Sequence, residues 1–570
     1  MLLSTTTSAM GLLSLMSLST ASEDVSCRAI PGDEAWPSVA EWNALNETVD
    51  GQLIATVPIG APCHNSYNGV STFDEEACAA LKNVWFLPET HYPTSSSPMA
   101  YPFSNNSCNP FVDPDVACTI GYYVAYAINV TEPAHVQAGI NFSNKHNVRL
   151  VVRNTGHDYL GRSTGAHGLA IWTHGMQSID KIDFNGPTYS GPALKLGAGV
   201  MAIDAYTFAD EHGLQVVGGN CPTVGLAGGY SSGGGHGPLA SKHGLGADQV
   251  LEFEIVTADG QILTANDTSN ADLFWALRGG GGGNYGVVLS ATVKAFPDTY
   301  ATTAAMSVNV NDDGTNTDTI YEFLASFLTG TVPSLVDKGV YVLFTMTSLG
   351  FALTPAFAPG MHQAELDALL QPALDKLNEL SLAFTYSSSE NATFLGAYNA
   401  LPTMWNVSDF NTGGRLIDRE MVFNKTDDLI AAIRNIGSEG LFSGVCLNVS
   451  QSVSSPDEVA VNPYFRTSLF NAFYGLATDY TSTTADQAAM DHITNDLTPP
   501  LAALTPGSGG AYMNEADVQE PDFQFIFYGA HYDRLLEIKR KYDPRDIFYA
   551  RTAVGSDAWY EQSDGRLCRV

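Results

Sequence analysis

The chain has 570 residues, of which 45% are hydrophobic and 10% aromatic, a composition typical of a folded globular protein. Since compact domains usually hold about 100–200 residues, this length predicts two large domains or more. Acidic residues outnumber basic ones by 60 to 26, and the net charge of -34 would repel nucleic acid and other polyanions. Such acidity helps to keep a protein in solution. It makes polyanionic partners improbable but indicates no catalytic activity.

The first residues are typical of a secretory signal peptide. An apolar stretch precedes the first charged residue, Glu23, and ends in small residues that predict cleavage after Ala21, although the usual basic residues before it are missing. The stretch is too short to span a bilayer, and no other run of about 20 apolar residues occurs. We therefore expect a secreted protein without membrane contact. Nine Asn-x-Ser/Thr sequons agree with export as a glycoprotein: Asn46, Asn105, Asn129, Asn141, Asn266, Asn391, Asn406, Asn424 and Asn448.

The eight cysteines should mostly pair in an oxidising compartment. The short loops favour disulfides Cys63–Cys78 and Cys108–Cys118, and a Cys27–Cys568 bond would tie the two ends of the chain together. Cys446 stands in an apolar run and is expected to be a buried free thiol. Cys221 stands alone among glycines, where burial is a poor explanation for it.

Changes in composition and residue pattern along the chain predict five segments. After the signal peptide, residues 22–120 are rich in Pro, Ser, Asn and Cys and predict an irregular, disulfide-stapled region. Residues 121–298 alternate short strands, helices and glycine turns, which indicates an α/β or α+β unit. The expected elements there are a helix around Val136 and Ile140, a strand at 148–152, a helix at 202–212, a strand at 214–217 and a hairpin of 250–257 with 261–265.

Residues 299–510 contain fewer glycines and longer helical patterns, with strands such as 340–345, and predict a second domain. The final segment, 511–570, includes an amphipathic helix with Tyr532, Leu535 and Leu536 on one face, ended by Asp543-Pro544.

Glycines are densest between Gly218 and Gly237, and a second run spans Gly279 to Gly283. An ordered glycine-rich loop costs backbone entropy, so it indicates positive φ angles or close approach of the backbone to a ligand. Such a loop can present several N–H groups to phosphates. Glycine richness alone could equally mark a tight turn, and His157 alone could be a capping or packing residue. The combination with Cys221 favours a cofactor site.

Two motifs carry a family resemblance. The strand that ends in Arg153-Asn154-Thr155-Gly156-His157-Asp158 resembles the FAD-binding signature of the vanillyl-alcohol oxidase and p-cresol methylhydroxylase (PCMH) family. The downstream Cys221-Pro222-Thr223-Val224-Gly225 resembles the berberine bridge enzyme branch, and the whole chain is most similar to the fungal isoamyl-alcohol-oxidase-like group. The resemblance extends over about 133–297 and the final forty or so residues.

The resemblance implies an α+β fold, in which a PCMH-type FAD-binding domain of two subdomains carries an inserted α+β substrate domain. It also implies FAD bonded at the 8α-methyl by His157 and at C6 by Cys221. Further contacts to FAD are implied for Arg153, Asn154, Thr155, Gly156, Asp158, Gly161, Ser163, Thr223, Gly225, Gly228, Gly229, Tyr230 and Gly233. Thr155, Asp158 and Tyr230 depart from the residues usual in the family, so some polar contacts to the flavin are expected to differ. No metal site is expected, because the chain has no His-Glu-x-x-His motif.

The implied reaction is hydride transfer from an alcohol or sugar-type C–OH group to flavin N5, followed by reoxidation by O₂ to H₂O₂. A flavin shielded from O₂ would make the enzyme a dehydrogenase instead. The substrate would be a small alcohol, an oligosaccharide or a secondary metabolite. Tyr528, Tyr512 and Asn514 are the candidate catalytic residues, and a tyrosine could act as the base only beside a cation or in a preformed hydrogen bond.

Two other functions are compatible with parts of the sequence. Gly229-Tyr230-Ser231-Ser232-Gly233 and Gly161-Arg162-Ser163-Thr164-Gly165 match the Gly-x-Ser-x-Gly pattern of secreted serine esterases. That pattern needs a strand before it and a helix after it, and the glycines that follow Ser232 do not favour a helix. A flavin-binding protein with little turnover is the third possibility, because cofactor residues can persist where substrate residues do not.

Overall fold

The computed structural model describes residues 27–401 and 406–570. The predicted signal peptide, residues 1–21, lies outside the described residues. Among the helices of the described ranges, none combines the length and the apolar character needed to cross a membrane.

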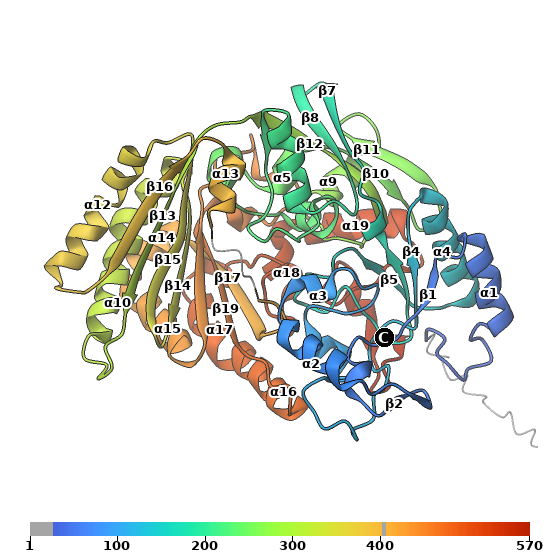
Figure 1. Ribbon diagram of the computed structural model, residues 1–570. Helices are drawn as coiled ribbons and strands as arrows, with labels where there is room; N and C mark the ends of the chain where they lie inside the picture. The colour runs from blue at the N-terminus through green and yellow to red at the C-terminus, as the bar shows by residue number, and fades with distance from the viewer. Residues whose placement is uncertain (1–26, 402–405) are drawn as a thin grey trace, which may run out of the picture.

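Three sheets and the helices around them make up most of the structure (Figure 1), which confirms the expected α+β class. The first sheet has four strands in the order β1-β4-β6-β5, and β1 alone runs antiparallel to its neighbour. Its strands are β1 (Leu53–Ala55), β4 (Tyr126–Asn129), β6 (Leu169–Trp172) and β5 (Leu150–Arg153). Helices α1 (Val39–Thr48) and α4 (Pro133–His146) share a buried core with this sheet.

The second sheet is antiparallel, in the order β11-β10-β12-β8-β7, with β9 paired to β12. Its strands are β7 (Ile179–Asn185), β8 (Ser190–Gly197), β9 (Leu214–Val216), β10 (Val250–Val256), β11 (Ile262–Asn266) and β12 (Val287–Pro297). The predicted hairpin is confirmed as β10 and β11, and the predicted helix at 202–212 is confirmed as α5 (Ala202–Glu211). Val256 and Val287 of this sheet lie in the same core as the first sheet, so the two sheets pack as one body.

The third sheet has seven antiparallel strands in the order β16-β13-β15-β14-β18-β19-β17. Its strands are β13 (Ala301–Asn309), β14 (Tyr341–Thr347), β15 (Gly350–Pro359), β16 (Thr385–Asn391), β17 (Phe410–Asp418), β18 (Leu441–Cys446) and β19 (Ser468–Ala477). Helices α10 (Thr317–Ser326), α12 (Gln363–Glu379) and α15 (Thr426–Glu439) cover its outer face, at the left of Figure 1.

The alternation of side chains along β14 and β19 decides which residues face the rest of the protein. Val342 and Phe470 point into the core under the outer helices. Tyr341 belongs instead to the core that includes the glycine-rich loop, and Asn471 bonds to the C-terminal segment. Because successive residues of a strand point to opposite faces, the inner face of this sheet can present polar groups to the loop.

The C-terminal segment returns to the first two sheets. Helix α19 (Tyr532–Tyr542) contacts α9 (Ala271–Leu277), and Phe548 forms a parallel bridge with Leu150 of β5. The predicted amphipathic helix is therefore confirmed, with Leu535 fully buried.

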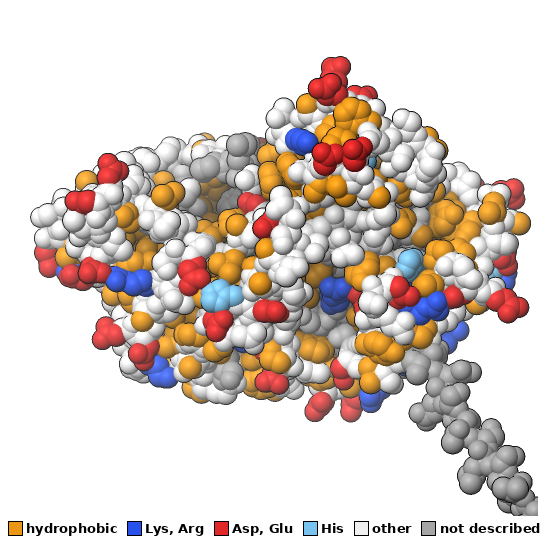
Figure 2. All heavy atoms as spheres, turned by 90° about the horizontal axis from the view of Figure 1, so that it is seen from below, with side chains coloured by type: hydrophobic (Ala, Val, Ile, Leu, Met, Phe, Trp, Pro, Cys, Tyr) orange, Lys and Arg blue, Asp and Glu red, His pale blue; other side chains and the backbone are white. Residues whose placement is uncertain are grey.

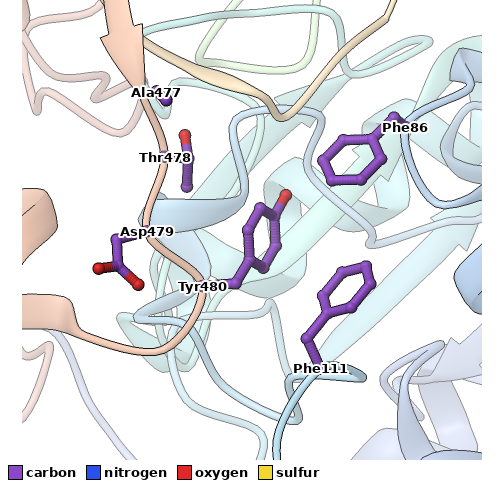
Figure 3. Close-up of a pocket in the computed structure, with 6 residues that line it drawn as sticks. All are labelled: Phe86, Phe111, Ala477, Thr478, Asp479 and Tyr480. Carbon is purple, nitrogen blue, oxygen red and sulfur yellow. The ribbon is translucent and has the colours of Figure 1, made fainter.

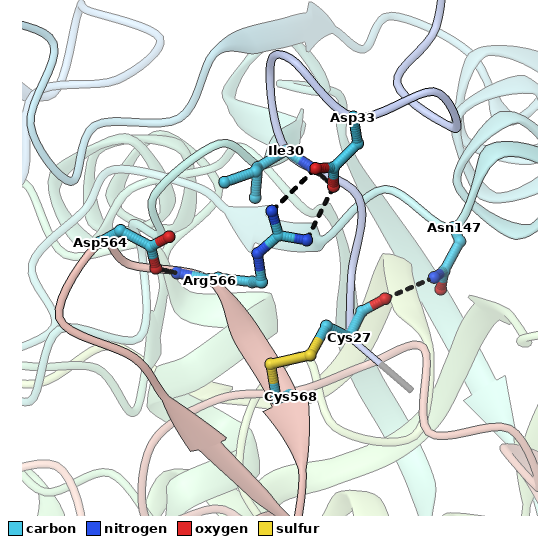
Figure 4. Close-up of a disulfide and its surroundings, with 7 residues drawn as sticks. All are labelled: Cys27, Ile30, Asp33, Asn147, Asp564, Arg566 and Cys568. Atoms are coloured by element: carbon cyan, nitrogen blue, oxygen red, sulfur yellow. Dashed lines mark hydrogen bonds and ion pairs between the residues drawn. A yellow bond between two sulfur atoms is a disulfide. The ribbon is translucent and has the colours of Figure 1, made fainter. Parts of the chain in front are cut away.

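All three predicted disulfides are present, and Cys446 is a buried free thiol as expected. Cys27–Cys568 joins the two ends of the described chain (Figure 4). Beside it, Arg566 forms a two-pronged ion pair with Asp33, with both distances 2.8 Å. These contacts fasten the N-terminal region to the C-terminal hairpin of β20 (Trp559–Glu561) and β21 (Leu567–Arg569).

The N-terminal region is more regular than its composition indicates. It contains two ten-residue helices, α1 and α2 (Glu75–Val84), where an irregular segment was expected. In α1 only Trp42 and Leu45 are buried, so the apolar periodicity is too sparse to predict a helix. The capping box between Ser38 and Glu41 is the sequence signal that marks its start.

Acidic side chains are scattered over the face in Figure 2, with basic ones between them, and form no single patch there.

Candidate active site

His157 and Cys221 reach the same place from different sheets. His157 follows β5 of the first sheet, and Cys221 lies in the loop after β9 of the second. Cys221 Sγ is 3.9 Å from His157 Nε2. Thr223 Oγ1 lies 2.7 Å from the same His157 nitrogen and 3.5 Å from Cys221 Sγ. One hydroxyl therefore contacts both predicted attachment residues.

The protonation of these two residues follows from their surroundings. Burial, aided by the nearby His91 and Arg153, lowers the pKa of His157 to about 3, so its imidazole is neutral at neutral pH. Burial raises the pKa of the Cys221 thiol, and hydrogen bonding from Thr223 partly opposes that shift. The resting site therefore holds a neutral imidazole and a protonated thiol.

The turn that carries His157 depends on Gly156 and Arg153. Gly156 has a φ of +83°, and a Cβ placed on it would lie 2.5 Å from the Arg153 guanidinium. Arg153 is buried, and its Nη2 donates to the backbone oxygens of His91, Thr94 and Ser97. Burial lowers the pKa of Arg153 to about 10. The guanidinium thus ties the N-terminal region to the turn.

The predicted FAD residues lie around this turn and the glycine-rich loop. Asn154 donates to Ala198 O at 2.6 Å and fills the space that a Cβ on Gly225 would need. A Cβ on Gly228 or Gly229, by contrast, would meet no heavy atom within 4 Å. Gly282 of the second glycine run packs against Gly229, where a Cβ would lie 2.7 Å from its Cα. The two glycine runs thus pack against each other, and the space beside the α-carbons of Gly228 and Gly229 is open.

Several buried polar atoms near these loops have no hydrogen-bond partner among the described residues. They are Arg153 Nε and Nη1, Asn154 Oδ1, Asn220 Oδ1, Ser232 Oγ and both amide atoms of Asn284. Unpaired buried polar groups are costly, and those gathered here are available to a polar ligand. Two nucleophiles, open glycine backbone and unpaired polar atoms together suit a large cofactor with phosphates and a ring system, as FAD has.

The remaining predicted contacts to FAD are dispersed around the site. Asp158 Oδ2 accepts from the backbone N–H groups of Leu160 and Arg162. Gly161, at a φ of +75°, packs on the Phe103 ring. Thr155, Tyr230 and Gly233 are buried, and Ser163 is half-buried. Tyr230 donates to His236 O at 3.3 Å, and a Cβ on Gly233 would collide with Asn514.

The three predicted catalytic residues lie close to Arg162 but differ in what they can do. Tyr528 is buried and donates to Thr552 O at 3.0 Å, and burial raises its pKa to about 12 although Arg162 opposes the shift. Tyr512 accepts from Gly235 N–H at 3.2 Å and from Asn514 Nδ2 at 3.0 Å. Arg162 is the cation that a tyrosine base would need, and its Nη1 lies 3.5 Å from Asn514 Oδ1.

A histidine–carboxylate pair, not predicted from the sequence, lies in the same site. His236 Nε2 is 3.0 Å from both oxygens of Glu515. Asn471 Nδ2 donates to Glu515 Oε2 at 2.7 Å, and Asn220 Nδ2 donates to Tyr341 OH at 2.6 Å. Tyr341 OH lies 3.5 Å from His236 Nδ1. The network joins the glycine-rich loop, the inner face of the third sheet and the C-terminal segment, and it begins next to Cys221.

The serine-esterase pattern does not have its required setting. Ser231 is 2% exposed, and its hydroxyl donates to Leu226 O at 2.7 Å. A helical turn, Leu226–Tyr230, precedes it in place of a strand. Ser163 lies in a loop without a following helix. Neither serine stands at a strand-to-helix turn.

A pocket of about 510 Å³ opens elsewhere, between the N-terminal region and the end of β19 (Figure 3). Phe86, Phe111 and Tyr480 turn their rings into it. None of its lining residues belongs to the His157–Cys221 site, so it is a separate surface feature.

Comparison with known proteins found two family models that match parts of the chain. The family model described as FAD binding domain matches residues 124–266, and the one described as berberine and berberine like matches residues 511–555. FAD-linked oxidoreductase sor8 of Hypocrea jecorina is 43% identical over 555 residues, which cover 97% of this chain and 95% of that protein.

Two solved structures are similar to different degrees. The crystal structure of VAO-type flavoprotein MtVAO615 from Myceliophthora thermophila C1 has a TM-score of 0.89 and 38% identity, covering 96% of this chain and 100% of that one. Glucooligosaccharide oxidase from Acremonium strictum, described with a 6-S-cysteinyl, 8α-N1-histidyl FAD, has a TM-score of 0.63 and 21% identity, covering 76% of this chain and 92% of that one. The second likeness concerns the fold alone.

The fold, the site and these matches define an FAD-linked oxidoreductase. The chain belongs to the berberine-bridge-enzyme-like branch of the vanillyl-alcohol oxidase and PCMH flavoprotein family.

Proposed function

We propose that this protein is a secreted oxidase, with FAD bonded to both His157 and Cys221, that oxidises a C–OH group of an alcohol or sugar-type substrate. The observation that carries the proposal is the 3.9 Å separation of Cys221 Sγ and His157 Nε2 beside unpaired polar atoms. Two nucleophiles this close can bond nearby positions of one ring system.

The residues of the chain suit these roles. Because His157 is neutral, its ring can act as a nucleophile, and its Nδ1 makes no hydrogen bond with the described residues. Thr223 fixes the other ring nitrogen at 2.7 Å and so orients the ring. Cys221 must lose its proton before it can bond carbon, because the thiolate is the nucleophile.

When bound, FAD would supply the redox chemistry, as an acceptor for the substrate hydride that O₂ can reoxidise with release of H₂O₂. The chain must hold the substrate C–H toward the cofactor and take up the hydroxyl proton. A small alcohol, an oligosaccharide and a secondary metabolite all remain candidate substrates. If the site shields the cofactor from O₂, the enzyme is a dehydrogenase with the same first step.

Three observations support the proposed export: the three disulfides of the structure, the predicted signal peptide and the nine sequons.

The test of attachment is the visible spectrum of purified protein before and after acid precipitation. His157→Ala, Cys221→Ala and the double variant are prepared in parallel. We expect yellow colour in the wild-type pellet and in each single variant, but not in the double variant. Flavin that washes out of the wild-type pellet would contradict covalent attachment.

The test of the reaction is peroxide release on a panel of alcohols and oligosaccharides, with flavin bleaching followed without air. Bleaching of the flavin by a substrate, followed by release of peroxide when O₂ is readmitted, supports the oxidase. Bleaching without peroxide indicates the dehydrogenase, and a flavin that no substrate bleaches indicates a binding protein.

A further inference from the structure

We infer that Glu515, paired with His236, is the group that takes the hydroxyl proton from the substrate, an inference that rests on the proposed oxidation of a C–OH group. The carboxylate of Glu515 offers about four acceptor sites, of which His236 and Asn471 use three, and neither predicted tyrosine has comparable capacity. The hydroxyl proton of Tyr528 is committed to a backbone oxygen, and Tyr512 OH already accepts two hydrogen bonds.

The position of the pair is the first support. His236 follows three consecutive glycines, 233–235, of the predicted FAD loop, and Glu515 lies three residues beyond Tyr512 in the C-terminal segment. Asn220, next to Cys221, is joined to His236 through Tyr341. The carboxylate is thus connected by three hydrogen bonds to the neighbour of a residue proposed to bond the flavin.

The exposure of the pair is the second support. The His236 side chain is 8% exposed and that of Glu515 is 21% exposed, so the carboxylate is the more accessible partner. Asn471 Oδ1 and Asn220 Oδ1 are buried without partners among the described residues. Both amides bond into the network through Nδ2, which leaves their oxygens to receive a donor such as a substrate hydroxyl.

The hydrogen bonds also fix the direction in which protons can move. A carboxylate only accepts, so His236 donates through Nε2–H to Glu515. Its Nδ1 is then the acceptor that faces Tyr341 OH. The substrate O–H bond breaks and its proton passes to Glu515, while the C–H bond breaks as a hydride that leaves for FAD and a C=O bond forms. The proton and the hydride supply the two hydrogens of H₂O₂, with O₂ as the oxidant.

Four tyrosines from different elements interact with the charge of Glu515: Tyr159 after β5, Tyr230 in the glycine-rich loop, Tyr341 on β14 and Tyr512 in the C-terminal segment. Further charged or titratable groups act on these tyrosines, Arg162 on Tyr512 and both Cys221 and Asp409 on Tyr159. Burial, with the charge of Glu515 adding to it, raises the pKa of the four tyrosines above its usual value. The phenols therefore stay protonated at neutral pH and do not compete with Glu515 for the proton.

The experiment compares flavin-loaded Glu515→Gln, Glu515→Asp and His236→Asn with the wild type. The control is Asp457→Asn, which removes the charge from a histidine–carboxylate contact outside the site, His531 Nε2 to Asp457 Oδ1 at 3.1 Å, in which the histidine is buried and the aspartate is exposed. Anaerobic reduction by a substrate alcohol is followed by stopped flow across a pH series. The spectrum of the oxidised flavin is titrated with pH in the same samples, without substrate.

We expect Glu515→Gln to keep its covalent flavin and to slow flavin reduction by about 10²–10⁴-fold, the usual contribution of a general base. It should also lose the ionisation seen in the wild-type reduction profile and in the spectral titration. Glu515→Asp should recover part of the rate, His236→Asn should shift that ionisation, and Asp457→Asn should change neither. A merely structural role for Glu515 would leave the ionisation in place.

Glu515→Gln with wild-type reduction rate or unchanged spectral titration would overturn the inference. If no alcohol or sugar reduces the wild-type flavin, the proposed function fails separately. The substrate-free titration still decides whether Glu515 and His236 form the ionising pair beside the flavin.

Discussion

Cys221 Sγ lies 3.9 Å from His157 Nε2, although 64 residues separate them in the chain. The strands that lead to them, β9 and β5, belong to different sheets. The shared core of these sheets therefore fixes the spacing of the two nucleophiles. Burial favours the uncharged form of both residues, because it lowers the pKa of the His157 imidazole and raises the pKa of the Cys221 thiol.

Replacing Thr223 with Val should impair flavin attachment. The substitution removes the hydroxyl that lies 2.7 Å from His157 and 3.5 Å from Cys221, so the ring loses its orientation and the thiol loses a group that lowers its pKa. A single hydrogen bond contributes about 1 kcal/mol, which corresponds to a several-fold slower attachment. The measurement is acid-stable flavin against time after FAD is added to flavin-free protein. Thr223→Ser keeps the hydroxyl and should behave as wild type, and equal rates for Val and Ser would contradict the role.

Gly156→Ala should destabilise the protein more than Gly213→Ala. Both glycines have positive φ angles, +83° and +67°. A Cβ at 156 would lie 2.5 Å from the Arg153 guanidinium, whereas one at 213 would have no heavy atom within 4 Å. The backbone cost is about 1–2 kcal/mol for each, and only Gly156→Ala must also displace a buried arginine. Urea unfolding measures the free energy of unfolding of both variants. Equal losses would show that the Arg153 side chain moves aside without cost.

Lys539→Met should cost about 3–5 kcal/mol in free energy of unfolding, the usual effect of breaking a buried ion pair. Lys539 and Asp543 are 2% and 0% exposed and 2.6 Å apart, and the ammonium also donates to two backbone oxygens. Lys541→Met removes a pair with Asp272 of the same 2.6 Å length, but with the lysine 59% exposed. That control should change stability by less than about 1 kcal/mol. Similar losses for the two variants would rule out burial as the cause.

Stability should fall in acid partly through Glu561. Burial alone would raise its pKa, but Arg149 and Arg551 outweigh burial and lower the pKa to about 2, from the ordinary value of 4.5. A lowered folded-state pKa gives stability that is fully present above about 4.5 and is lost as the pH falls toward about 2. The shift corresponds to about 3 kcal/mol. Urea unfolding across this pH range should show a weaker pH dependence for Glu561→Gln than for wild type, and parallel curves would refute the assignment.

Local patterns in the sequence were sufficient for much of the fold. The helix α5 ends before Gly213, the hairpin of β10 and β11 encloses Asp259-Gly260, and the disulfides of short loops follow from spacing. Each of these depends on residues close together in the chain. The helix α1 was missed because only two of its residues are buried, so its stability comes from packing against α4 and not from its own pattern.

The sequence by itself determined the cofactor class, because the residues around His157 and Cys221 form two short continuous motifs. The tertiary structure alone decided the pairing of His236 with Glu515, which are 279 residues apart and belong to no common motif. Their contact arises because the alternation of β14 and β19 turns Tyr341 and Asn471 toward the glycine-rich loop, where the C-terminal segment also returns. Short motifs can specify how a cofactor is held, whereas a proton acceptor assembled from distant segments depends on how the sheets pack.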